Sequence, residues 1–142
     1  MKIASWIYAA LTAAAFLGMV DSSYVAFHAA KGFLIPCGFA GGCDQVLSSP
    51  YARLLGISIA WFGLAFYLTI AAASLFAMYG YPEALRISLI PAAAAFLFTL
   101  YLFFLQAFVI RAFCDYCLLS ASLVLSIFGL HLWARPWRST GP

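Results

Sequence analysis

Charged side chains are scarce in this sequence of 142 residues, because Asp, Glu, Lys and Arg make up 8% of it whereas 67% is hydrophobic. With a mean hydropathy of +1.05, the chain has too few polar residues to cover the surface of a soluble domain. The seven Lys and Arg residues stand singly at the ends of apolar runs and form no basic patch, which argues against nucleic-acid binding. The composition indicates an integral membrane protein.

Four apolar stretches are long enough to cross a membrane, which takes about 20 residues of helix. They cover residues 3–27, 57–79, 87–110 and 116–133. The first runs past the length of about 7 to 15 residues that a secretory signal uses, so we expect it to be retained as a helix. We therefore predict an all-α bundle of four transmembrane helices, a single membrane domain over 1–142, with a long first extramembrane loop over 28–56.

The loop over 28–56 is the only connection with room for structure of its own. Its first part is rich in glycine, a composition typical of mobile backbone. Residues 43–55 predict a short helix that Pro50 bends or divides. The apolar side of this helix would carry Val46, Leu47, Ala52 and Leu55.

Four spans place both termini on one side of the membrane and both cysteine-bearing connections on the other. The terminal side carries Lys2, Arg86, Arg135 and Arg138, and the cysteine side carries Lys31, Arg53 and Arg111. This small excess favours cytoplasmic termini. Paired thiols that form disulfides are typical of an oxidising compartment. We expect a bacterial inner membrane with all four cysteines on the periplasmic side; the lumen of the endoplasmic reticulum or of thylakoids is the alternative.

Cys114 and Cys117 form a tight pair at the start of the fourth span. A separation of three residues places both thiols on one face of a helix, within reach of disulfide closure. The amide groups and dipole at a helix N-terminus favour a thiolate, so a lowered thiol pKa is expected at this motif. Cys117 would lie about 4 to 5 Å deeper than Cys114. Cys114 is thus placed to exchange with a loop thiol, and Cys117 to meet a lipid-soluble electron acceptor such as a quinone.

Cys37 and Cys43 form a looser pair that encloses a small, glycine-rich ring. A disulfide there can open and close without disturbing a packed core, which suits a shuttle; a permanent structural disulfide is the alternative. A zinc site made by all four cysteines is less favoured, because two membrane spans separate the pairs. His28 and His131 are expected near opposite membrane faces, and we predict no metal site.

Aromatic residues make up 18% of the sequence and could line a cavity for a ring-shaped ligand. The individual candidates are Phe16, Tyr67, Phe104 and Tyr116.

Several residues, taken together, match one known family. They are Tyr24 and His28, Cys37 and Cys43, the run Cys-Asp-Gln-Val-Leu-Ser-Ser-Pro-Tyr-Ala over 43–52, Gly56 and Ile57, and Cys114 and Cys117. On these residues the chain resembles the vitamin K epoxide reductase family in its short bacterial form, over nearly its whole length. Oxidases of the DsbB type also carry four cysteines on four helices, but with the tight pair first. One departure is Ser58, where many members of the family have proline.

The resemblance implies a quinone-dependent thiol–disulfide oxidoreductase that supports disulfide bond formation. In this scheme the Cys37–Cys43 disulfide oxidises a thioredoxin-like, DsbA-like partner, and Cys43 then exchanges with Cys114. Cys117 passes the electrons to ubiquinone or menaquinone. The sequence ends at Pro142 without a fused thioredoxin-like domain, so the partner is expected to be a separate protein.

The resemblance also implies three residues near the quinone. Ser49 matches a serine six residues after the second loop cysteine, although it could equally cap a helix before Pro50. Leu47 and Ala121 match positions that contact the vitamin K ring in the animal enzymes. Both are smaller here, which argues against vitamin K epoxide as the substrate.

Two other classes of function fit the thiols less well. A non-enzymatic membrane protein that binds or transfers a soft metal ion would favour cysteines within helices or methionine-rich tracts, whereas Met1, Met19 and Met78 are dispersed. A purely structural bundle held by two disulfides is the third hypothesis.

Overall fold

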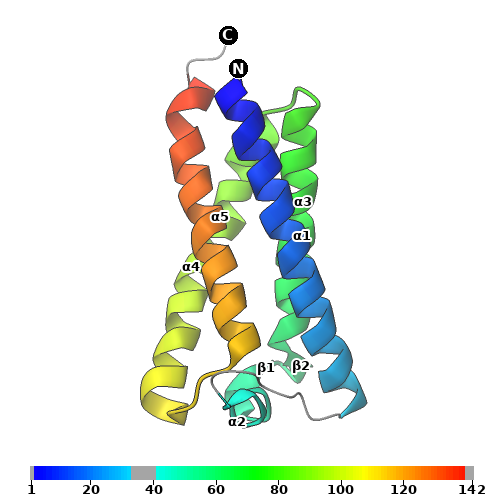
Figure 1. The fold of residues 1–142 in the computed structure, drawn as a ribbon, viewed down its shortest axis with the longest axis vertical. Helices are drawn as coiled ribbons and strands as arrows, with labels where there is room; N and C mark the ends of the chain where they lie inside the picture. Colours follow the sequence, from blue (N-terminus) through cyan, green and yellow to red (C-terminus); the bar gives the residue numbers. More distant parts are fainter. Residues whose placement is uncertain (1, 33–40, 140–142) are drawn as a thin grey trace.

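Four long helices form an antiparallel bundle, which confirms the predicted fold (Figure 1). The computed structural model describes residues 2–32 and 41–139. The long helices are α1 (Lys2–Lys31), α3 (Ile59–Met78), α4 (Glu83–Phe104) and α5 (Asp115–Ser139). A π-helical segment, η2 (Leu105–Ile110), continues α4. Each of the four contains a stretch long and apolar enough to cross a membrane.

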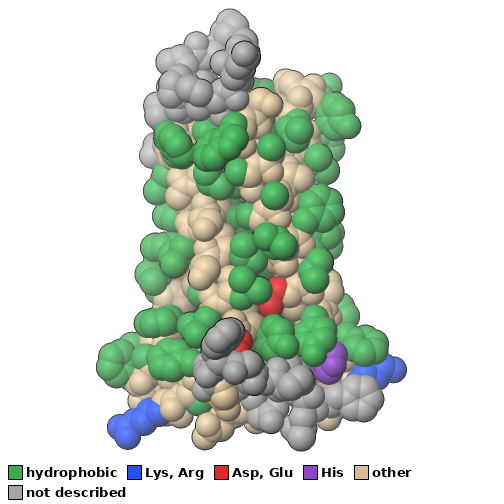
Figure 2. All heavy atoms as spheres, in the orientation of Figure 1, with side chains coloured by type: hydrophobic (Ala, Val, Ile, Leu, Met, Phe, Trp, Pro, Cys, Tyr) green, Lys and Arg blue, Asp and Glu red, His purple; other side chains and the backbone are tan. Residues whose placement is uncertain are grey.

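The four helices follow one another around the bundle. α1 packs chiefly against α3 and α5, and α4 packs chiefly against the same two helices. Both termini lie at one end of the bundle, and the start of α5 lies at the other, which we call the thiol end (Figure 1). Figure 2 shows apolar side chains along the visible face and Lys or Arg side chains at the thiol end. Such an apolar outer surface suits contact with lipid, as expected for an integral membrane protein.

Small residues allow α1 and α3 to approach closely. A Cβ atom on Gly18 of α1 would collide with the ring of Tyr67 on α3. One turn along, a Cβ on Gly63 would lie 3.1 Å from the hydroxyl of Ser22. Small residues four apart are a common basis of helix packing in membranes. They let the Tyr67 ring sit fully buried in the core.

The helix bounds differ from the predicted spans wherever a helix continues beyond its apolar run. α1 extends past the predicted end at residue 27 to Lys31, and Gly32 follows it with a φ of +73°. α4 begins at Glu83 rather than at residue 87, since Pro82 suits a helix start and Glu83 pairs with Arg86 at 3.0 Å. α5 similarly extends beyond residues 116–133. A membrane requires only the apolar part, so hydropathy alone underestimates helix length.

The second half of the loop forms a compact cap at the thiol end. It contains α2 (Cys43–Leu47), the 3-10 helix η1 (Pro50–Ala52), and a two-stranded antiparallel hairpin of β1 (Arg53–Leu54) and β2 (Ile57–Ser58). Helical structure is divided before Pro50, as predicted. The expectations of helix through residue 55 and of a second span starting at residue 57 were wrong, because the hairpin occupies 53–58 and α3 begins at Ile59.

Leu55 does not belong to the apolar side of the cap. It is 92% exposed in the two-residue turn of the hairpin, with a φ of +56°, whereas Val46 and Ala52 are buried as predicted. Turns of this kind require positive φ at both central residues, and Gly56 supplies the second at +83°. Ser58, the departure from the family pattern, is the N-cap of α3 and accepts a hydrogen bond from the amide of Ala60.

Candidate thiol and ligand site

Cys114 occupies the N-cap position of α5. The backbone amide of Cys117 donates to the Cys114 sulfur at 3.4 Å, and the amide of Leu118 donates to the Cys114 carbonyl at 2.9 Å. A capping side chain normally accepts from the third helical amide in this way, and here a sulfur does so. Cys114 and Cys117 are both free thiols in this structure. The tight pair therefore lies at the start of a helix, as the sequence predicted.

Gln106 fixes the backbone of Cys114 from the end of the preceding span. Its Oε1 accepts a hydrogen bond from the Cys114 amide at 3.1 Å, and its backbone carbonyl accepts one from the Ala112 amide at 3.1 Å. Gln106 lies in η2, and Arg111 ends that segment in the left-handed region at a φ of +58°. These two bonds turn the chain sharply enough that Cys114 returns under the cap.

The two thiols differ in their surroundings. Cys114 has no exposed surface and packs in a small apolar cluster with Val46 of α2 and with Ala112. Cys117 is half-buried and lines the cavity described below. One thiol thus lies beneath the cap and the other opens toward the interior of the bundle.

The Cys114 thiol is the better thiolate of the pair. A hydrogen bond from the Cys117 side chain lowers the pKa of Cys114, and the amides of Cys117 and Tyr116 lower it further; burial opposes the shift without cancelling it. A lowered pKa means that the thiolate is present at a lower pH than for an ordinary cysteine. Release of Cys114 from a mixed disulfide is favoured accordingly, since a thiol of lower pKa is the better leaving group.

A pH titration tests this assignment. In a protein whose Cys37 and Cys43 are replaced by alanine, the absorbance of the Cys114 thiolate should rise with a midpoint below that of an ordinary cysteine. Cys117→Ala should move the midpoint upward because the hydrogen bond is lost, whereas Cys117→Ser should move it less because a hydroxyl can still donate. The thiolate signal is measured as the difference from a variant that also carries Cys114→Ser. Equal midpoints for the alanine and serine variants would contradict the role given to the Cys117 side chain.

The backbone next to Cys43 contacts the backbone next to Cys114. The amide of Gly42 donates to the carbonyl of Phe113 at 3.1 Å, so the residues next to Cys43 and Cys114 are in direct contact. A Cβ on Gly42 would lie 2.7 Å from that carbonyl oxygen and 2.9 Å from the Phe113 nitrogen. The approach is therefore possible only for glycine. Cys37 lies outside the described residues, and for Cys43 the structure describes the backbone alone.

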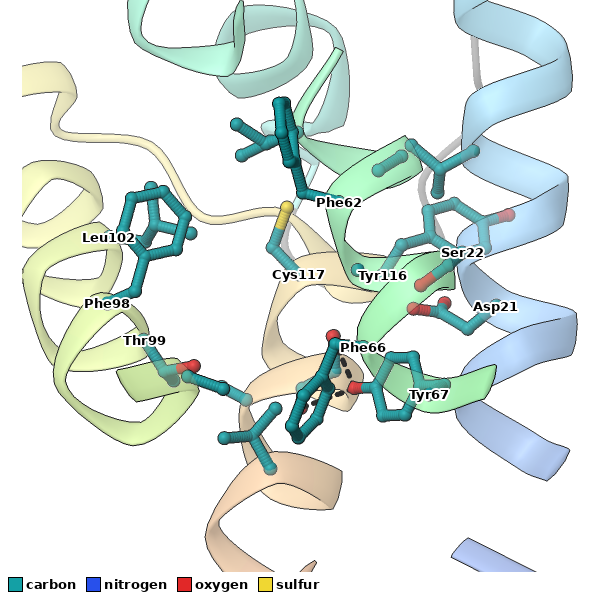
Figure 3. A pocket seen from close by; sticks show the side chains of 18 of the residues that line it. Asp21, Ser22, Phe62, Phe66, Tyr67, Phe98, Thr99, Leu102, Tyr116 and Cys117 are labelled. Atoms are coloured by element: carbon teal, nitrogen blue, oxygen red, sulfur yellow. Dashed lines mark hydrogen bonds between the residues drawn. The ribbon is translucent and has the colours of Figure 1, made fainter. Parts of the chain in front are cut away.

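A partly open cavity of about 350 Å³ lies between the helices at the thiol end of the bundle (Figure 3). All four long helices contribute to it, and Leu47 and Leu54 of the cap close it toward the thiol end. Most of its wall is apolar or aromatic. The polar or titratable residues on the wall are Asp21, Ser22, Tyr67, Thr99, Gln106, Tyr116, Cys117 and Ser120. A largely apolar cavity of this size with a few polar groups is typical of a site for a small organic ligand.

The three residues that the resemblance places near a quinone lie in two different positions. Leu47 and Ala121 line the cavity. Ser49 lies instead beside a smaller hollow that Leu47 and Cys117 also border. Its hydroxyl donates to the Val46 carbonyl at 2.7 Å, and it precedes η1 without making a capping hydrogen bond. The Ser49 hydroxyl thus ties η1 to α2 in this structure.

Two of the four aromatic candidates face the cavity. Tyr67 and Tyr116 line it, and the Tyr67 hydroxyl is held by the Ser120 hydroxyl at 2.7 Å (Figure 3). Tyr116 also lies against Tyr24, with ring centroids 5.2 Å apart. Phe16 and Phe104 do not line it and are each about half exposed, which places them on the outer surface of the bundle.

Sequence reasoning missed Asp21, Thr99 and Gln106. Each is a polar side chain within an otherwise apolar span, and each lines the cavity. Ionisable residues inside a membrane span are costly and usually functional, so the acidic residue in the first apolar run was a usable signal. Gln106 offered a weaker one, because a neutral amide in a membrane helix is more common.

A comparison with protein families identifies a match over most of the chain. The family model described as the vitamin K epoxide reductase family matches residues 9–132. The matched region includes the four apolar stretches almost entirely and both cysteine pairs.

Proposed function

The chain belongs to the vitamin K epoxide reductase family, whose members are membrane oxidoreductases that couple thiols to quinones, and from this premise we propose that it oxidises a separate thioredoxin-like protein and reduces a quinone. The partner is of the DsbA type, and the activity supports disulfide bond formation. The quinone is ubiquinone or menaquinone.

The observation that carries this proposal is the placement of Cys117. Its thiol belongs to a two-cysteine motif at a helix start and also lines a largely apolar cavity within the bundle. A quinone ring is apolar enough to enter such a space from the lipid. Thiol and acceptor would then meet away from bulk water.

The proposed electron path has three steps. A thiol of the reduced partner attacks the Cys37–Cys43 disulfide, which becomes a dithiol as the partner becomes a disulfide. Cys43 then attacks a Cys114–Cys117 disulfide, and exchange restores Cys37–Cys43 while leaving Cys114 and Cys117 reduced. Finally Cys114 and Cys117 close again to a disulfide and give two electrons and two protons to the quinone, which becomes a hydroquinone. The hydrogen bond between Gly42 and Phe113 supports the second step, because it brings the backbone beside Cys43 to the backbone beside Cys114.

The same proposal assigns the residues that surround the quinone and the side of the membrane that the thiol end faces. Leu47 and Ala121 contact the quinone ring, since both line the cavity that Cys117 reaches. Ser49 acts near the thiols, beside the smaller hollow that it shares with Cys117. The thiol end faces the periplasm of a bacterial inner membrane, where the partner is found.

Quinone-linked turnover tests the function directly. Purified protein in detergent, given a reduced DsbA-type protein and a short-chain ubiquinone or menaquinone, should form one hydroquinone for each partner disulfide. In a Cys43→Ala variant Cys37 is a free thiol, which should attack the disulfide of the oxidised partner and form a mixed disulfide that is visible on a non-reducing gel. Stoichiometric bound metal without hydroquinone formation would instead support the soft-metal alternative.

A further inference from the structure

Asp21 is a carboxyl group inside the first membrane span. It lies more than nine-tenths buried in α1, and its Oδ1 has no hydrogen-bond partner among the residues that the structure describes. A buried polar atom without a partner costs a few kcal/mol, and a carboxyl within a membrane costs more if it is charged. The close contacts between α1 and α3 in this region involve Gly18 and Ser22, on either side of Asp21 in the sequence.

The Asp21 carboxyl faces the same cavity as the Cys117 thiol. It projects from α1 beside Ser22 and Tyr67, whereas Cys117 reaches the cavity from α5 (Figure 3). Among the residues that the structure describes, the other titratable groups on the wall are Tyr67 from α3 and Tyr116 from α5; α4 contributes none, and no described Lys or Arg lines the cavity. The Tyr67 hydroxyl is already engaged by Ser120 at 2.7 Å. Asp21 is therefore the acid of the cavity with an unused oxygen.

Quinone reduction creates a need for such a group. A quinone accepts two electrons and two protons, one proton on each of two oxygens at opposite ends of its ring, whereas Cys117 is the thiol on the wall and reaches the cavity from α5 alone. Water is scarce in a largely apolar cavity inside a membrane. An acid on another helix can serve the oxygen that the thiols do not reach, because general acids must lie within hydrogen-bonding reach of the atom they protonate.

We propose that Asp21 is a catalytic acid that protonates one oxygen of the bound quinone; this rests on the proposed function. As Cys114 and Cys117 close to a disulfide and two electrons enter the quinone, the Asp21 O–H bond breaks and an O–H bond forms on the quinone oxygen. The other oxygen receives one thiol proton, and the second thiol proton returns to the Asp21 carboxylate. Dithiol and quinone thus become disulfide and hydroquinone, and Asp21 is regenerated.

Single-turnover kinetics with the reduced protein and a short-chain ubiquinone test the proposal. Asp21→Asn keeps the shape of the side chain but cannot give up a proton as an acid does, and it should slow hydroquinone formation by about 100-fold or more. Asp21→Glu should recover much of the rate. The oxidation of a partner dithiol by the loop disulfide should be unchanged in both variants. Ser23→Ala, on the exposed side of the same helix, is the control and should match the unmodified protein.

The pH profile separates acid catalysis from a structural role. In the unmodified protein the rate of hydroquinone formation should rise and then fall with pH, the fall marking loss of the donor proton; Asp21→Asn should lack the fall. Because this profile is measured first on the unmodified protein, the proposal stays testable even if a variant folds poorly. A normal single-turnover rate in Asp21→Asn, or an unchanged alkaline fall, would overturn the role of Asp21. No hydroquinone from the unmodified protein would overturn the proposed function itself.

Discussion

Cys117→Ala is expected to abolish quinone reduction, with a loss of at least about 1000-fold in the rate of hydroquinone formation. The reason is that Cys117 is the thiol on the cavity wall, while Cys114 has no exposed surface. Removing the group that reacts leaves binding intact but no path for the electrons, and losses of this size are usual for a covalent catalytic residue. The measurement is a single turnover, in which chemically reduced protein is mixed with a short-chain quinone and hydroquinone absorbance is followed.

Cys37→Ala gives the matched contrast. It should retain the single turnover from Cys114 and Cys117 to quinone and lose the oxidation of the partner, because it lacks only the outer disulfide. Ser126→Ala, on the exposed side of α5, should leave both steps unchanged and controls for the effect of mutating that helix. If Cys117→Ala reduced quinone at the rate of the unmodified protein, the electron path proposed here would be wrong.

Gly42→Ala is expected to slow electron transfer from the partner to the quinone by about 100-fold. Its methyl group would overlap the backbone of Phe113, so the cap must move away from the segment that leads to Cys114. A displacement of about 1 Å is enough to cost this much when two reacting groups must meet. The rate is measured as steady-state hydroquinone formation with a reduced DsbA-type partner as the donor.

The single turnover from Cys114 and Cys117 to quinone should be nearly normal in Gly42→Ala, because the substitution lies outside the cavity. Gly129→Ala is the matched control: it adds the same methyl group at a glycine in α5 that faces open space, and both rates should stay unchanged. Normal transfer from the partner in Gly42→Ala would show that the contact between Gly42 and Phe113 does not position the two pairs.

The sequence predicted the bundle and the helix-start position of Cys114 because both depend on local patterns. Apolar length alone indicates a membrane span, and a three-residue cysteine spacing beside an acidic first-turn residue, Asp115, suits a helix N-terminus. The turn at Leu55 could not be predicted in this way. Its positive φ is stabilised by the pairing of Arg53 with Ser58, which forms only in the folded loop.

The residues that line the cavity could not be predicted from the sequence either, for a different reason. In a soluble protein a helix shows its buried side by a stripe of apolar residues, but here the lipid-facing side is equally apolar. The rotation of each helix is set instead by small residues at close contacts, such as Gly18 against Tyr67. Phe16 and Tyr67 therefore looked alike as ligand candidates, although one faces outward and the other inward.

Under the proposed function, the burial of Cys114 beneath α2 also limits side reactions of its thiol. A low-pKa thiol open to water would react with any small disulfide nearby, and its electrons would be lost to that disulfide instead of reaching the quinone. Cys114 has no exposed surface, so its sulfur is shielded from molecules in the water. The cap that covers it begins at Cys43. In the proposed electron path Cys43 exchanges with Cys114, so the residue that reacts with Cys114 also begins the segment that shields it from other reactants.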